Sequence, residues 1–243
     1  MALLKNRVAL VTGGSRGIGR AIAISLAEAG AGVAVNYRER EDEARSVVEA
    51  IRGAGGQAMM VKADVSQAVD VEAMMAAIER ELGPVDVLVN NAGVGLVRSV
   101  DELTEADFDL TIAVNLKSVF LCTQAVLPGM RARQWGRIVN ISSGAARGAG
   151  GVGPHYNASK AGMEGMTRGY AARLVKDGIT VNAVAPSLIE TDMVRGGVAA
   201  SPARIPLGRF GTPDECAQIV MMLVGNAYMT GQTVALSGGL SFL

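Results

Sequence analysis

Residues 8–19 read VALVTGGSRGIG, and their pattern is the strongest indication of the fold. Its first part, residues 8–12, is a run of β-branched and small apolar side chains that predicts a buried strand. Glycines follow at once and permit a tight turn. Residues 17–29 then show the spacing of a helix. A buried strand that enters a helix through a glycine-rich turn is typical of the first unit of an α/β fold.

The same alternation of strand and helix continues outward from this stretch. The last helix begins with Thr212 as N-cap, Pro213 at its first position and Glu215 in a capping box. Such repeated units predict a doubly wound, Rossmann-type α/β fold, with a mostly parallel seven-stranded sheet, helices on both faces, and residues 1–243 as one domain. The expected strands span residues 8–12, 32–37, 58–62, 85–90, 137–142, 180–185 and 233–236, and the expected helices span residues 17–29, 41–54, 66–82, 108–130, 156–176 and 212–224.

Composition excludes several classes of protein. The 23 basic and 23 acidic residues balance, and no basic run suggests nucleic acid. Cys122 and Cys216 lie in apolar helical stretches and are expected to be core residues, while His155 is the one histidine, so no metal site is predicted. No signal layout and no membrane-spanning apolar run is apparent, which predicts a cytoplasmic protein that does not enter a membrane.

The glycine-rich turn at residues 12–19 is a candidate phosphate site. Glycines let the backbone approach a diphosphate, and the following helix offers free N–H groups and partial positive charge. The spacing G-x-x-x-G-x-G differs from the G-x-G-x-x-G dinucleotide fingerprint, and glycine turns also occur for packing alone. Its place after the first strand favours dinucleotide binding.

The end of the second strand distinguishes NAD from NADP. An acidic residue there would bind the ribose 2′-hydroxyl and repel a 2′-phosphate, but the segment Tyr37–Arg38 carries none. Arg38 and Arg16 could grip a 2′-phosphate, or could be ordinary surface arginines. Asp64 and Val65 could hold the adenine, and Asp64 could equally cap the next helix. The segment favours NADP.

A second cluster, near the carboxyl ends of later strands, carries acid–base chemistry. Tyr156 and Lys160 lie one turn apart on one helix face, where a lysine ammonium would lower the tyrosine pKa from about 10. Ser143 follows a strand and could polarise a carbonyl oxygen. Asn115 could bend its apolar helix and hold a proton-relay water, or be a satisfied core residue. His155 is expected to be structural or substrate-lining.

Taken together, these motifs resemble the short-chain dehydrogenase/reductase family over essentially the whole chain, and most of all its 3-oxoacyl-[acyl-carrier-protein] and acetoacetyl-CoA reductases. The matching motifs are TGGSRGIG (12–19), ADVS (63–66), NNAG (90–93), Asn115, ISS (141–143), YNASK (156–160) and residues 182–192. The resemblance implies a homotetramer, a tetrad of Asn115, Ser143, Tyr156 and Lys160 with Tyr156 as proton donor, and Asn90 near the adenosine ribose. It further implies that NADPH or NADP⁺ contacts Gly13, Ser15, Arg16, Gly17, Ile18, Gly19, Tyr37, Arg38, Asp64, Val65, Asn91, Ala92, Gly93, Tyr156, Lys160, Pro186, Ile189 and Thr191.

Three features depart from the family pattern. Ser187 replaces the usual glycine after Pro186, and the substrate lid around residues 187–211 is short. Gln134 and Asp177 occupy neighbourhoods that are basic in carrier-protein reductases, which disfavours an acidic carrier protein.

The expected activity is reduction of a ketone by NADPH, with a 3-oxoacyl thioester of fatty acid biosynthesis as the favoured substrate and acyl carrier protein as an open partner. The alternatives are an NAD(P)-dependent dehydrogenase of another secondary alcohol, sugar or steroid, and a nucleotide-sensing scaffold without catalysis.

Overall fold

A computed structural model describes residues 3–192, 194 and 201–241, and they form one seven-stranded sheet flanked by helices. Every strand pair in the described chain is parallel, so the sheet is more uniform than the mostly parallel one expected from the sequence. The strands are β1 (Val8–Val11), β2 (Gly32–Tyr37), β3 (Ala58–Lys62), β4 (Val87–Asn90), β5 (Gly136–Ile141), β6 (Ile179–Pro186) and β7 (Thr233–Leu236).

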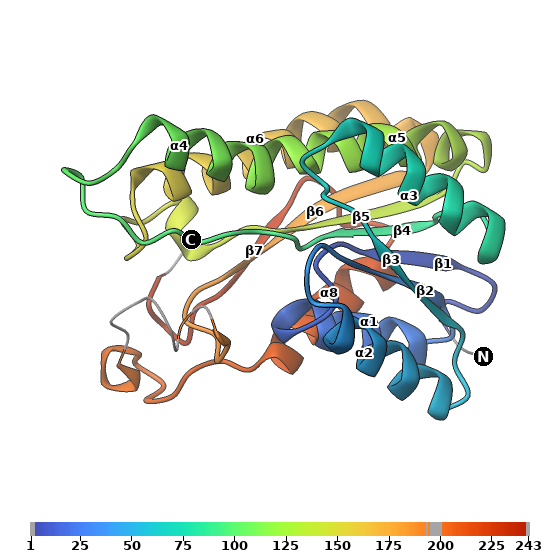
Figure 1. The fold of residues 1–243 in the computed structure, drawn as a ribbon, viewed down its shortest axis with the longest axis horizontal. Helices are drawn as coiled ribbons and strands as arrows, with labels where there is room; N and C mark the ends of the chain where they lie inside the picture. The colour runs from blue at the N-terminus through green and yellow to red at the C-terminus, as the bar shows by residue number, and fades with distance from the viewer. Residues whose placement is uncertain (1–2, 193, 195–200, 242–243) are drawn as a thin grey trace.

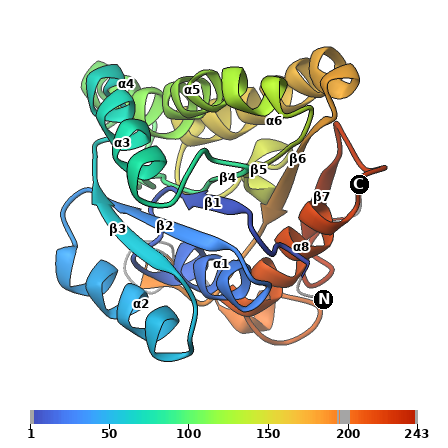
Figure 2. The same cartoon turned by 90° about the vertical axis from the view of Figure 1, so that its right-hand side faces the viewer.

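Helices cover both faces of this sheet, as Figures 1 and 2 show. Helices α1, α2 and α8 lie on one face, and α3 to α6 lie on the other. Their bounds are α1 (Gly17–Glu28), α2 (Glu41–Gly53), α3 (Ala68–Glu81), α4 (Glu105–Ile112), α5 (Ser118–Ala132), α6 (Pro154–Leu174) and α8 (Pro213–Gly225), with a π-helical segment at Ala113–Lys117 and short 3₁₀ turns at Gly144–Ala146, Val175–Asp177 and Pro202–Arg204.

The strand order is β3-β2-β1-β4-β5-β6-β7. The chain runs outward from β1 to β3 and then returns to place β4 on the other side of β1. This reversal creates a crevice beyond the carboxyl ends of β1 and β4, where ligands of doubly wound folds bind. The topology therefore places the glycine-rich turn and the later motifs at the same edge of the sheet.

Alternating side chains of each strand divide the core into two layers. Ala9 and Val11 of β1 pack in the cluster with α1, α2 and α8, whereas Val8 and Leu10 pack in the cluster on the opposite face. All four are buried, which explains why the strand is almost wholly apolar. Cys122 and Cys216 are fully buried, which confirms their prediction as core residues.

The long helix expected at residues 108–130 begins earlier and contains an irregular turn. Thr104 caps it, with its Oγ1 accepting from the backbone N of Asp107 (3.1 Å). At Ala113–Lys117 the helix widens into a π-turn around Asn115. This irregular turn lies where the sequence predicted that Asn115 bends the helix, and a π-turn inserts one extra residue into an α-helix.

The combined helix Glu105–Ala132 also has the length and apolar composition of a membrane span, with a mean hydropathy of 1.6 in its most apolar window. Half of that window is buried within the fold. Core helices of soluble proteins meet the same criterion, and α5 packs against both α3 and β4. The length and composition of this helix are therefore only weak evidence for membrane insertion.

Candidate active site

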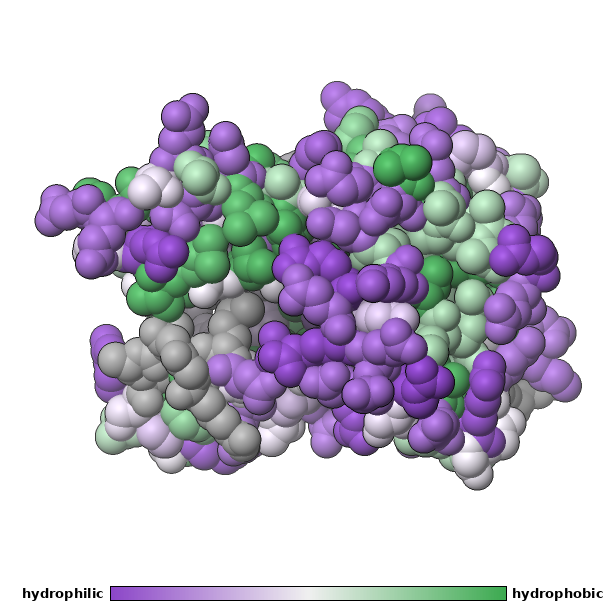
Figure 3. Space-filling model, viewed as in Figure 1, coloured by the Kyte–Doolittle hydropathy of each residue, from purple (hydrophilic) through white to green (hydrophobic). Residues whose placement is uncertain are grey.

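A cavity of about 530 Å³ opens at the carboxyl edge of the sheet. This volume is typical of small-molecule sites. Figure 3 shows apolar surface bordering the hollow below α4. Exposed apolar side chains of α4 and the loop before it include Val97, Val100 and Phe108. All eighteen residues expected to contact the cofactor line the cavity, together with Ser143, Asn36, Val94, Val114, Ser142 and Ser187.

The glycine-rich turn forms the floor of one end of the cavity. Gly13 has a φ of 60°, and a Cβ built on Gly19 would lie 2.3 Å from the Gly13 carbonyl oxygen. The turn is fixed by Asn91, whose Nδ2 donates to the carbonyls of Thr12 and Gly13 (both 2.9 Å). Helix α1 starts at Gly17 without a side-chain cap, so its first amides face the cavity edge. These features fit the diphosphate of a dinucleotide.

Asn36 completes this turn and had no assigned role in the sequence analysis. Its Oδ1 accepts from the backbone N of Gly13 (3.1 Å), and its Nδ2 donates to the carbonyl of Ala63 (3.1 Å). The side chain is buried and links β1, β2 and the end of β3. A buried amide at a strand end was the available signal, because such groups need partners.

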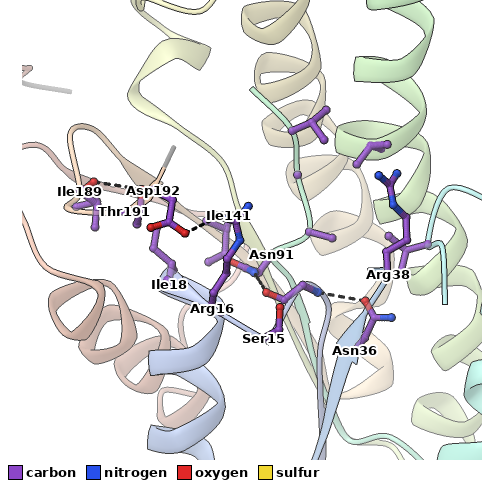
Figure 4. Close-up of a pocket in the computed structure, with 18 of the residues that line it drawn as sticks. Ser15, Arg16, Ile18, Asn36, Arg38, Asn91, Ile141, Ile189, Thr191 and Asp192 are labelled. Atoms are coloured by element: carbon purple, nitrogen blue, oxygen red, sulfur yellow. Dashed lines mark hydrogen bonds and ion pairs between the residues drawn. The ribbon is translucent and has the colours of Figure 1, made fainter. Parts of the chain in front are cut away.

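The two arginines expected at a 2′-phosphate line the cavity, but both are paired with carboxylates. Arg16 Nη1 lies 2.6 Å from Asp192 Oδ2, as Figure 4 shows, and Arg38 Nη2 lies 2.6 Å from Glu39 Oε1. Arg38 is also 3.9 Å from Asp64. Both guanidiniums are about half exposed, so these ion pairs are weak and exchangeable.

Asp64 lies in the cavity wall and does not cap a helix. Its Oδ1 accepts from the backbone N (3.0 Å) and Oγ (2.7 Å) of Ser66, which is a local turn contact. Helix α3 begins later, at Ala68, after Gln67. Of the two interpretations of Asp64, only the position at the cavity agrees with the structure.

Ser143, Tyr156 and Lys160 meet at the other end of the cavity. Tyr156 and Lys160 come from the first turns of α6, which Pro154 begins at N1. Lys160 Nζ lies 5.7 Å from the Tyr156 ring centroid and donates to the carbonyl of Ile141 at the end of β5 (2.8 Å). Ser143 lies two residues beyond Ile141, the last residue of β5, and hydrogen-bonds to the Tyr156 side chain. The sheet and one helix thus bring the three predicted groups together.

Burial shifts the pKa values of the two titratable groups. It lowers the pKa of Lys160 to about 8. It raises the pKa of Tyr156 above its ordinary value, and the hydrogen bond from Ser143 offsets this only in part. The net lowering of the tyrosine pKa that the sequence predicted is therefore not observed among the protein's own groups, because the effect of desolvation is the larger one. Tyr156 is a neutral phenol at neutral pH and can donate a proton.

Asn115 lies beneath the cavity wall, fully buried, with a satisfied side chain. Its Oδ1 accepts from the backbone N of Val94 (2.8 Å), and its Nδ2 donates to the carbonyl of Val94 (3.0 Å) and to Ser159 Oγ (3.2 Å). The side chain thus anchors the loop after β4 to α6. The proton-relay role remains a prediction.

Two further expectations are resolved by contacts outside the cavity. Asn90 Nδ2 donates to Asn140 Oδ1 (2.8 Å) inside the fold, so this side chain joins β4 to β5, and the contact of Asn90 with an adenosine ribose stays a prediction. His155 is buried, and its Nε2 lies 3.0 Å from the carbonyl of Leu96. This contact supports the structural interpretation of the histidine.

The segment after β6 forms one wall of the cavity. Pro186, Ile189 and Thr191 line it as predicted, and Ser187 Oγ occupies space that a Cβ on Gly144 would need (2.6 Å). The predicted lid at residues 187–211 lies partly outside the described residues, since 193 and 195–200 are not among them. Among the described residues, no group of three or more His, Cys, Asp or Glu could hold a metal ion.

Comparisons with known proteins agree with this geometry. The family model for short chain dehydrogenases matches residues 7–200. The chain is 42% identical over 246 residues to the 3-oxoacyl-[acyl-carrier-protein] reductase FabG of Staphylococcus epidermidis, covering 97% of this chain and 99% of the relative. It is 40% identical over 244 residues, 98% of each chain, to the (2S)-[(R)-hydroxy(phenyl)methyl]succinyl-CoA dehydrogenase subunit BbsD of Thauera aromatica.

A solved structure extends the likeness to three dimensions. The structure of a putative gluconate dehydrogenase from Agrobacterium tumefaciens superimposes with a TM-score of 0.93 at 33% identity, covering 100% of both chains. The relatives and the cavity together show an oxidoreductase that uses a nicotinamide cofactor and acts on CH–OH or C=O groups. The chain therefore belongs to the short-chain dehydrogenase/reductase family.

Proposed function

We propose that this enzyme is a cytoplasmic, NADPH-dependent reductase that converts the ketone of a 3-oxoacyl thioester to a secondary alcohol, with Tyr156 as the proton donor. The observation that carries the proposal is the convergence of Ser143, Tyr156 and Lys160 at the end of a cavity whose other end is the glycine-rich turn. The phenol of Tyr156 is protonated at neutral pH, as the proton donor of a reduction must be.

Ser143 and Tyr156 would act on the carbonyl oxygen from two sides. The Ser143 hydroxyl donates a hydrogen bond that polarises the C=O bond and fixes its orientation. Tyr156 delivers its proton to that oxygen as the carbonyl carbon gains a C–H bond, so the C=O group becomes CH–OH. The dinucleotide, when bound along the cavity, supplies the hydride.

Lys160 would stabilise the charge that this step creates. Its ammonium lies against the Tyr156 ring and is held by the carbonyl of Ile141. A cation at this range lowers the cost of forming the phenolate, most strongly in a partly dry cavity. Gly93 permits the crowding of this region, since a Cβ there would lie 3.3 Å from Asn115 Oδ1 and 3.6 Å from Lys160 Nζ.

A thioester substrate is supported by the names of two relatives. One is an acyl-carrier-protein reductase, and the other is a dehydrogenase of a CoA thioester. Two basic side chains in the neighbourhoods of Gln134 and Asp177 are already paired: Arg131 Nε lies 2.8 Å from Asp177 Oδ2, and Arg133 Nε lies 3.1 Å from Asp86 Oδ1. These pairs reduce the positive charge that this surface offers to an acidic carrier protein, so we propose a coenzyme A thioester as a substrate beside an acyl-carrier-protein thioester.

The activity test measures NADPH oxidation in the presence of acetoacetyl-CoA, monitored as the loss of near-ultraviolet absorbance. We expect turnover, and we expect acetoacetyl-CoA to be used at least as efficiently as acetoacetyl-acyl-carrier protein. No turnover on any 3-oxoacyl thioester, together with turnover on a simple ketone or sugar acid, would contradict the thioester assignment.

The pH dependence of this reduction should show a single descending limb. Below about pH 8, Lys160 is an ammonium that stabilises the phenolate formed from Tyr156; as pH rises through about 8, that charge is lost. We therefore expect kcat/KM for the thioester to fall about tenfold per pH unit above about pH 8. A Lys160→Arg variant, whose charge persists, should lack the limb at whatever activity it retains. A flat wild-type profile would contradict this assignment of Lys160.

Preference for NADP over NAD is the finer part of the proposal. Arg16 belongs to the glycine-rich turn and Arg38 follows β2, and Figure 4 labels both in the cavity. A 2′-phosphate would displace exposed carboxylates from them. We expect Arg38→Asp to weaken NADPH binding about 30- to 100-fold while NADH binding changes little. Fluorescence titration of both cofactors measures this. Wild-type preference for NADH would instead favour the alternative, an NAD-dependent dehydrogenase of a secondary alcohol or sugar.

We also propose that the enzyme is a homotetramer. Exposed apolar side chains of α4 and α5 include Leu110 and Phe120, and a second hollow of about 490 Å³ lies between the π-turn region, α5 and α6. Extended exposed apolar surface on a soluble protein typically marks an interface. A second copy of the same face is the expected occupant, on the resemblance to the family.

A further inference from the structure

Helix α6 presents polar side chains toward the sheet beyond the two catalytic groups. Tyr156, Lys160 and Glu164 occupy the same face at successive turns, and they are 8%, 4% and 3% exposed. A glutamate that is almost wholly buried is uncommon unless a partner neutralises it. The mechanism proposed above gives Glu164 no role.

The partner of Glu164 is Arg147. Arg147 Nε donates to Glu164 Oε2 at 2.8 Å, while Ser142 Oγ lies 3.3 Å from both Glu164 Oε1 and the carbonyl of Lys160. The Arg147 side chain is 41% exposed and that of Glu164 is 4% exposed. One ion pair, anchored inside the protein, therefore joins α6 to the segment that follows β5.

That segment carries Ser143. Ser143 begins the short 3₁₀ turn Gly144–Ala146 and Arg147 ends it, with the backbone N of Ala146 donating to the Ser143 carbonyl (2.9 Å). The next two residues are tied to α6 as well, because Asn157 Nδ2 donates to the carbonyls of Gly148 (2.9 Å) and Ala149 (2.7 Å). Asn157 and Glu164 thus hold the segment against the helix at two points.

We propose that Arg147 and Glu164 are positioning residues, whose ion pair holds Ser143 in place against Tyr156. Neither residue needs to touch the ketone. The pair acts through the 3₁₀ turn, so it sets the distance from the Ser143 hydroxyl to the Tyr156 phenol. This inference rests on the proposed function, since it concerns the geometry of the same reaction.

Removing one partner should cost more than removing both charges. Arg147→Met leaves the Glu164 carboxylate buried without its cation, and the local structure must shift to hydrate it. Displacements of about 1 Å in a reacting group cost up to about 100-fold in rate. We expect Arg147→Met to lower kcat about 10- to 100-fold, and Glu164→Gln, which keeps the side-chain volume, about 10-fold.

The double variant Arg147→Met/Glu164→Gln tests whether the two residues act as a unit. We expect its kcat to be no lower than that of Arg147→Met alone, because no uncompensated carboxylate remains. Arg147→Lys should recover part of the loss, since it restores the charge. If the fold-loss of kcat in the double variant equals the product of the two single losses, Arg147 and Glu164 act independently, and the proposal is overturned.

The matched control is Arg131→Met. Arg131 makes an ion pair of the same length to Asp177, beyond the carboxyl end of α6. We expect its kcat to stay within about twofold of wild type. NADPH affinity and melting temperature are measured for every variant, and assays are run well below the lowest melting point. If the ion pair were purely structural, its removal would lower the melting temperature and leave kcat per NADPH-binding site unchanged.

Two further outcomes separate this inference from the proposed function. If wild type reduces the ketone but Arg147→Met and Glu164→Gln keep full kcat, the positioning role is overturned and the function stands. A crystal structure of Glu164→Gln gives a readout independent of substrate. An unchanged Ser143 Oγ to Tyr156 Oη distance there would overturn the positioning role even if the activity proposal had failed.

Discussion

Replacement of Tyr156 by Phe should reduce ketone turnover by about 1,000-fold or more while leaving NADPH affinity within about twofold of wild type. The change removes one oxygen atom from a ring that is 8% exposed and packed with Ala145 and Val152. The ring remains, so the packing remains. What is lost is the proton that must reach the carbonyl oxygen, together with its hydrogen bond to Ser143.

Two measurements are needed for each variant: the rate of NADPH oxidation with the ketone present, and the NADPH dissociation constant from a fluorescence titration. Lys160→Met makes a useful second variant, because it should lower turnover while also weakening cofactor binding. Retention of more than about a tenth of wild-type kcat in Tyr156→Phe would mean that another group supplies the proton. Loss of NADPH binding in Tyr156→Phe would mean that the Tyr156 hydroxyl mainly binds the cofactor and is not mainly a proton donor to the ketone.

Gly19→Ala should abolish cofactor binding, with NADPH affinity falling more than about 100-fold. The added methyl group would lie 2.3 Å from the carbonyl oxygen of Gly13 and 2.5 Å from Asn91 Nδ2. Neither neighbour can retreat easily. The Gly13 carbonyl accepts a hydrogen bond from Asn91, and Asn36 holds the amide of Gly13, so displacement of the turn disrupts the phosphate site.

Gly53→Ala is the control for this substitution. Gly53 ends α2, and a Cβ there would meet nothing within 4 Å. Alanine at such a position should leave NADPH affinity unchanged and stabilise the helix slightly. Isothermal titration with NADPH and thermal melts distinguish the two variants. Wild-type affinity in Gly19→Ala would show that the turn does not approach the cofactor closely.

The sequence predicted the sheet and the cavity wall well, for a clear physical reason. Strands buried on both faces must be apolar throughout, so β1 and β2 are visible as short runs bounded by turn residues. Parallel strands also force the carboxyl-end motifs to one edge. Tyr156 and Lys160 could be paired before any coordinates, because a spacing of four residues on a helix fixes their side.

Other features could not be predicted from spacing. The pairing of Arg16 with Asp192 joins residues distant in the chain, and no local pattern announces it. The direction of the Tyr156 pKa shift depends on how much water reaches the phenol, which composition does not report. Spacing also does not single out Glu164, because a charged residue on a helix is ordinarily solvated, and only its burial shows otherwise.

The π-turn at Ala113–Lys117 has a consequence for the phase of its helix. An extra residue advances the angular position of everything that follows by about 100°, relative to an uninterrupted α-helix. The apolar stripe of α5, including Cys122 and Val126, faces the sheet only with that offset included. Insertion or loss of one residue here would rotate the stripe out of the core, so length in this segment is constrained as tightly as the identity of Asn115.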